Sequence, residues 1–116
     1  MTAWKDIGPI DAFSKELHAV ELDGTTILVV RLGDLFYAMQ ERCPHRGGHL
    51  SQGHLEGTEL VCPVHGSRFD VTDGRLIRWV AGLPGLVREL ATTFGQPRGL
   101  EVYPVEIRSD HVWVKI

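Results

Sequence analysis

Long hydrophobic runs, clustered positive charge and a surplus of cysteine are all missing from this 116-residue sequence. The longest aliphatic run, Ile27–Val30, is far shorter than the roughly 18 apolar residues that a membrane span needs. Net charge is −3, and the basic residues are scattered, which argues against nucleic acid or an anionic membrane as a partner. The N-terminal stretch carries acidic residues and a proline where a secretory peptide would be basic and then apolar. We therefore expect a soluble, cytoplasmic protein with no membrane or nucleic-acid partner.

Cysteine is scarce, since Cys43 and Cys62 are the only two in the chain. In a reducing compartment such a pair more often binds a metal or takes part in catalysis than forms a disulfide. A disulfide would also leave unexplained the histidine that follows each cysteine within three residues, His45 and His65. The pair therefore favours a metal site.

Short β-rich runs make up most of the chain. Three turn pairs separate predicted strands: Gly33-Asp34, Asp73-Gly74 and Ser109-Asp110. The second of these pairs suits a primed hairpin turn. The pattern predicts an all-β fold, an antiparallel sandwich or small barrel, and the length is typical of one domain spanning residues 1–116.

One segment, at about residues 84–95, departs from the β pattern. Its apolar residues recur at helical spacing: Leu83, Leu86, Val87, Leu90, Ala91 and Phe94. Pro84 suits a first helical turn, and Gly95 suits a helix stop. The segment predicts one short inserted helix, which either caps the open end of the β body or forms a docking surface for a partner.

The cysteines and histidines form two mixed arms, Cys43-x-His45 and Cys62-x2-His65, with sixteen residues between them. Two Cys and two His suit tetrahedral zinc, so a zinc site is one hypothesis. Structural zinc motifs, however, usually pair like ligands within an arm. Mixed arms fit a binuclear iron cluster better, with two Cys and two His ligands to a [2Fe–2S] centre.

These residues resemble the Rieske-type ferredoxins of ring-hydroxylating oxygenase systems. The stretches CPHRGGHLS, CPVHGSRFDVTDG and EVYPVEI are all similar to family segments. The resemblance implies a β-sandwich base that carries a small cluster-binding subdomain, with its cluster-binding loops at about residues 42–70. It also implies one Rieske [2Fe–2S] cluster, with Cys43 and Cys62 on the inner iron and His45 and His65 on the outer, redox-active iron.

The same resemblance assigns supporting roles to residues near the ligands. Gly47, Gly48 and Gly66 would let backbone amides approach the cluster sulfurs, although they could be ordinary turn glycines. Ser67 would donate its hydroxyl to a sulfur, or else be an exposed turn serine. Pro84 would belong to a third loop that shields the cluster. The remaining histidines are expected to be bystanders: His18, His49, His54 and His111.

The implied function is that of a soluble one-electron carrier. It would pass electrons from a flavin-dependent reductase to a terminal oxygenase, without catalysing a reaction itself. A chain of 116 residues leaves no room for the additional mononuclear iron domain of an oxygenase subunit. Two alternatives stay open: a small subunit of a nitrite-reductase-like enzyme, and a zinc-bound interaction domain without a redox role.

Overall fold

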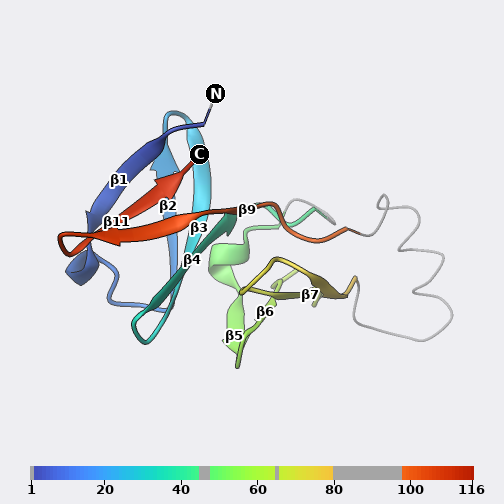
Figure 1. Cartoon of the computed structure of the whole chain (residues 1–116). Helices are drawn as coiled ribbons and strands as arrows, with labels where there is room; N and C mark the ends of the chain where they lie inside the picture. The colour runs from blue at the N-terminus through green and yellow to red at the C-terminus, as the bar shows by residue number, and fades with distance from the viewer. Residues whose placement is uncertain (1, 45–47, 65, 80–97) are drawn as a thin grey trace, which may run out of the picture.

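The structure is a computed structural model that describes residues 2–44, 48–64, 66–79 and 98–116. These residues form three antiparallel β-sheets and two short 3-10 helices (Figure 1). The expected all-β class is confirmed. The predicted helix at about 84–95 lies outside the described residues. Among the residues that are described, no helix is both long and apolar enough to cross a membrane.

The first sheet has the strand order β1-β11-β10 and joins the two ends of the chain. Its elements are β1 (Trp4–Pro9), the 3-10 helix η1 that follows it (Ile10–Ala12), β10 (Val105–Arg108) and β11 (His111–Lys115). The predicted C-terminal hairpin is confirmed, because Arg108 lies opposite His111. Ser109 and Asp110 turn the chain with φ values of 49° and 63°, and two positive values in a two-residue loop define a primed turn.

The second sheet has the order β2-β3-β4-β9. Its strands are β2 (Leu17–Leu22), β3 (Thr25–Leu32), β4 (Leu35–Gln40) and β9 (Val102–Tyr103). The predicted β3–β4 hairpin is confirmed by the pairing of Leu32 with Leu35. Gly33 suits this tight turn because it adopts a φ of 63°, a conformation that most residues with a side chain rarely adopt. From the end of β4 the chain leads directly to Cys43.

The third sheet has the order β5-β6-β7-β8, is smaller because each of its strands has only three residues, and follows the 3-10 helix η2. Its elements are η2 (Leu50–Gln52), β5 (His54–Glu56), β6 (Glu59–Val61), β7 (Arg68–Asp70) and β8 (Leu76–Arg78). Figure 1 shows this sheet beside the two larger ones. The arrangement is the expected sandwich base with a small subdomain, and β6 ends one residue before Cys62.

The turn between β7 and β8 differs from the predicted primed hairpin turn. Five residues connect Asp70 at the end of β7 to Leu76 at the start of β8, and only Gly74 among them has a positive φ, of 79°. The Asp70 carboxylate organises the longer loop by accepting hydrogen bonds from the Thr72 hydroxyl at 2.6 Å and the Thr72 amide at 2.9 Å. These bonds lower the pKa of Asp70. The turn propensity of Asp73-Gly74 predicted a two-residue turn, but it gave no sign of these Asp70–Thr72 hydrogen bonds, which stabilise a longer loop instead.

Strand β3 lies at the centre of the packing because both of its faces are buried. Ile27 and Val29 belong to an apolar cluster that includes Val112 and Val114 of β11. Leu28 and Val30, on the other face, belong to a second cluster that includes residues of the small sheet. The continuous apolar run in β3 therefore reflects a middle strand between two layers rather than a half-exposed one.

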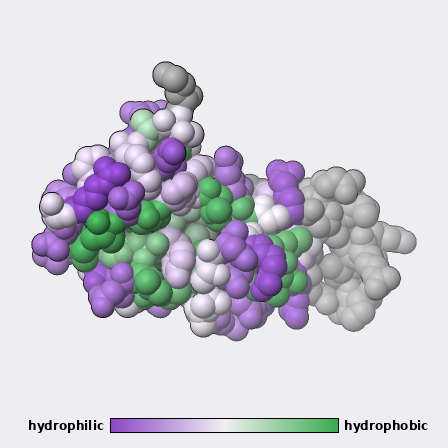
Figure 2. Space-filling view, in the orientation of Figure 1, coloured by the Kyte–Doolittle hydropathy of each residue, from purple (hydrophilic) through white to green (hydrophobic). Residues whose placement is uncertain are grey.

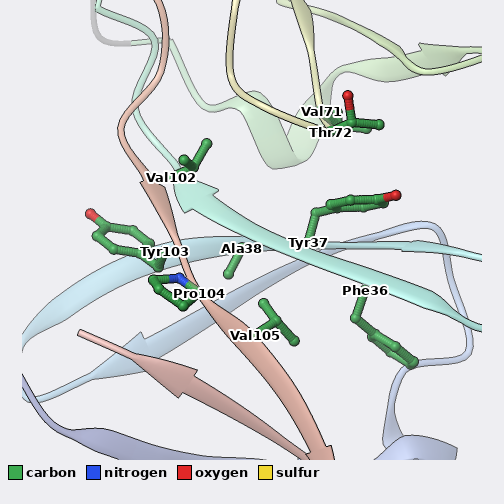
Figure 3. A pocket seen from close by; sticks show the side chains of 9 residues that line it. All are labelled: Phe36, Tyr37, Ala38, Val71, Thr72, Val102, Tyr103, Pro104 and Val105. Atoms are coloured by element: carbon green, nitrogen blue, oxygen red, sulfur yellow. The ribbon is translucent and has the colours of Figure 1, made fainter.

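A shallow apolar groove of about 400 Å³ opens beside β4 (Figure 3). Its lining residues are Phe36, Tyr37, Ala38, Val71, Thr72, Val102, Tyr103, Pro104 and Val105. Burial raises the pKa of Tyr103. On the face drawn in Figure 2, apolar patches are interrupted by hydrophilic side chains.

Candidate cluster-binding site

The first predicted ligand loop begins where β4 ends. Cys43 is only 2% exposed, and its amide donates to the Gly48 carbonyl at 2.7 Å. An isolated β-bridge between Arg42 and His49 brings the two limbs of the loop together. The loop is therefore narrow at its base, and it holds Cys43 on the inner side against the core.

The second predicted ligand loop has a matching construction after β6. Cys62 is 1% exposed, and its amide donates to the Ser67 carbonyl at 2.8 Å. The Gly66 amide donates back to the Cys62 carbonyl at 3.1 Å, so this amide points into its own loop. Gly66 adopts a φ of 71°, which explains why a glycine follows His65.

The two loops meet at Gly48. A Cβ at this position would lie 3.2 Å from the Cys62 sulfur and 2.5 Å from Cγ2 of Val64. A larger residue here would have to displace the Val64 side chain and press against the Cys62 sulfur, so the close approach of the second loop favours glycine. This contact brings the two loops of the predicted site together in space, although they are far apart in the sequence.

The surroundings of the two cysteines fit an iron–sulfur cluster. Both belong to one apolar cluster with residues such as Leu50, Leu60 and Phe69. Val64, at the tip of the second loop, is 49% exposed, so the site lies between the core and the surface. Thiolates are soft ligands suited to iron–sulfur clusters, and an apolar shell limits the access of water.

Four of the predicted site residues lie outside the described residues: His45, Gly47, His65 and Pro84. Their roles remain predictions. In the part of the chain that the structure describes, no three His, Cys, Asp or Glu side chains gather as a metal site. The described structure therefore places the two cysteines and leaves both predicted histidine ligands untested.

Ser67 has a different partner from the one expected. Its side chain is fully buried, which rules out the exposed turn serine, and its hydroxyl donates to the backbone carbonyl of Trp79. A serine hydroxyl has a single proton, so a bond to Trp79 leaves none for a cluster sulfur. Ser67 thus joins the second ligand loop to the chain that leaves β8.

Ser67→Ala is expected to lower the free energy of unfolding by about 1–3 kcal/mol, because a buried hydrogen bond is lost. The midpoint potential should stay close to that of the wild type. Thermal unfolding and protein-film voltammetry check the two expectations, with the exposed Ser14→Ala as the control. A potential drop of about 40–90 mV would instead show that the hydroxyl donates to a cluster sulfur.

Sequence reasoning missed Glu41, the buried carboxylate at the base of the first loop. It contacts His49, which was expected to be a bystander, at 2.8 Å between Oε1 and Nδ1. A glutamate two residues before a cysteine has no distinctive spacing, so the sequence contained no signal for this contact. The other expected bystanders have local partners: His18 with Lys15, His54 with Glu56 and His111 with Asp6.

Comparison with known proteins identifies the class. The family model for the Rieske [2Fe-2S] domain matches residues 3–93, so the chain belongs to this family, and its cofactor is one Rieske-type cluster. The ferredoxin component of the naphthalene 1,2-dioxygenase/salicylate 5-hydroxylase systems of Ralstonia sp. is 28% identical over 114 residues. That match covers 97% of this chain and 95% of the relative.

Solved structures of similar length show the same fold. The ferredoxin of carbazole 1,9a-dioxygenase from Nocardioides aromaticivorans IC177 superimposes with a TM-score of 0.74 and 27% identity. The match covers 97% of this chain and 96% of the carbazole 1,9a-dioxygenase ferredoxin. A chain in the complex of reduced oxygenase and oxidized ferredoxin in carbazole 1,9a-dioxygenase has a TM-score of 0.71 and 29% identity. This match covers 96% of our chain and 91% of the other.

Proposed function

We propose that this protein is a one-electron carrier that receives electrons from a flavin-dependent reductase and delivers them to a terminal oxygenase. The observation that carries the proposal is the meeting of the two ligand loops at Gly48, with both cysteines buried and Val64 exposed beside them. The proposal is supported by the ferredoxin components that match nearly the whole chain, one of them a chain in a complex with an oxygenase.

Four residues would hold the cluster: Cys43, His45, Cys62 and His65. When bound, the cluster supplies a one-electron couple. The buried thiolates of Cys43 and Cys62 would ligate the inner iron and exclude water from it, while the two imidazoles would ligate the outer iron. Neutral imidazoles in place of two thiolates leave less negative charge at the site, which makes the addition of an electron easier.

We also propose that residues 1–116 form a single domain, since β3 contributes side chains to both apolar clusters. The zinc-bound interaction domain is disfavoured because the chain belongs to a [2Fe–2S] family. The nitrite-reductase-like subunit differs from the carrier in being bound permanently to a large partner. Size-exclusion chromatography of cell extract would separate these two functions.

The purified protein is expected to contain about two irons and two acid-labile sulfides per chain, and its midpoint potential should fall between about −150 and +300 mV. Protein-film voltammetry and iron and sulfide assays measure these quantities. Stopped-flow mixing with an oxygenase should show oxidation of the reduced protein. Stoichiometric zinc without sulfide, or a reduced protein that no oxygenase of this class oxidises, would contradict the proposal.

A further inference from the structure

Glu41 has the one buried charged side chain among the residues that the structure describes, with an exposure of 2%. It directly follows β4 and precedes Cys43 by two residues. Burying a carboxylate is unfavourable unless its oxygens accept hydrogen bonds. The contacts of this carboxylate therefore indicate why a glutamate occupies the position.

Both carboxylate oxygens of Glu41 bind the opposite limb of the first ligand loop. Oε1 lies 2.8 Å from Nδ1 of His49. Oε2 accepts the Ser51 hydroxyl at 2.9 Å and the Ser51 amide at 3.2 Å. The Glu41 backbone carbonyl accepts the Leu50 amide at 2.8 Å. The glutamate thus closes the loop that contains Cys43, and we call this set of contacts the Glu41 clasp.

The neighbours of His49 determine which way its hydrogen bonds run. Nη1 of Arg42 lies 2.9 Å from Nε2 of His49. Because a guanidinium can only donate, Nε2 must accept, and the ring proton is therefore on Nδ1. Nδ1 then donates to Glu41, so each of the three contacts of the carboxylate comes from a donor. An acceptor with two equivalent oxygens fits this arrangement, whereas an amide does not.

We propose that Glu41 is a positioning residue for the cluster: its clasp holds the Cys43 loop in the geometry that the cluster needs, and its buried charge lowers the midpoint potential. The inference rests on the proposed function. The Cα atoms of Glu41 and Cys43 are at most about 7 Å apart, so the buried charge and an iron bound by Cys43 belong to the same small loop. Reduction adds negative charge to the site, and a nearby carboxylate opposes that addition.

The main test is Glu41→Gln, with Glu21→Gln on the exposed face of β2 as the matched control. Glutamine removes the charge and turns an amide NH2 toward a donor, either His49 or Ser51. We expect the equilibrium constant for reduction to rise about tenfold, which is about 59 mV upward in potential. Loss of iron to a chelator should be several-fold faster. The control should match the wild type in both measurements.

Ser51→Ala separates the geometric effect from the effect of charge. It removes the hydroxyl contact but keeps the carboxylate and the Ser51 amide. Faster loss of iron with a nearly unchanged potential is expected. If Glu41→Gln does not fold, Ser51→Ala alone tests whether the clasp holds the Cys43 loop. A wild-type rate of iron loss in Ser51→Ala would then overturn the proposed role of the clasp.

The outcomes distinguish this inference from the proposed function. A wild-type protein that contains no cluster would refute the proposed function itself. A wild type that contains the cluster, with Glu41→Gln equal to Glu21→Gln in both potential and iron loss, would overturn the role of Glu41 alone. An altered potential in Glu41→Gln cannot come from a purely structural defect if cluster content and the visible spectrum are unchanged.

Discussion

Cys62→Ser should abolish cluster binding, with iron and acid-labile sulfide falling to less than about a tenth of the wild-type content. The reason is that the thiolate is the form that binds iron, whereas a serine hydroxyl stays protonated at neutral pH. Cys62 is buried against Gly48 of the other loop, so no solvent ligand has ready access to replace it. Chemical assays and the visible spectrum measure the loss.

His54→Asn provides the control for this experiment. His54 is exposed in β5 and hydrogen-bonds to Glu56, so its replacement changes a potential metal ligand without touching either loop. This variant should keep the wild-type content of iron and sulfide. Full cluster content in Cys62→Ser, or equal loss in both variants, would show that Cys62 is not a ligand.

Gly48→Ala is the second variant with a large expected effect. Its Cβ would lie 2.5 Å from Val64 Cγ2 and 3.2 Å from the Cys62 sulfur, so the Val64 side chain must shift and the Cys62 sulfur is crowded. Overpacking of this kind costs about 1–3 kcal/mol, and here the strain falls on the geometry of the site. We expect a lower melting temperature and several-fold lower cluster occupancy, measured by calorimetry and by iron assay.

A double-mutant cycle tests the cause of this effect. Val64→Ala removes Cγ2, the nearest atom to the added Cβ, so Gly48→Ala should be less damaging in that background, with a coupling energy of about 0.5–3 kcal/mol. Gly57→Ala is the control, because its Cβ would meet nothing within 4 Å although the φ is 65°. It should destabilise the fold modestly and leave cluster occupancy unchanged. Strict additivity between positions 48 and 64 would contradict the packing explanation.

Local patterns predicted the parts of the fold that depend on neighbouring residues. The β3–β4 and β10–β11 hairpins were predictable because each has a short turn between alternating or β-branched runs. Strand β1 was not predicted, since its partner β11 lies at the opposite end of the chain. Strand pairing at such separation has no local sequence signal, and packing of the whole sandwich decides it.

For the candidate site, the sequence determined the cysteine and histidine spacing, the family that this spacing resembles and therefore the type of cluster. Only the tertiary structure decided that Gly48 packs against Cys62, that Ser67 bonds to Trp79 and that Glu41 binds His49 and Ser51. The physical reason is that ligand identity depends on the chemistry of single side chains, which the sequence states directly. Hydrogen-bond partners and close contacts depend on which segments meet when the apolar faces of three sheets are buried together.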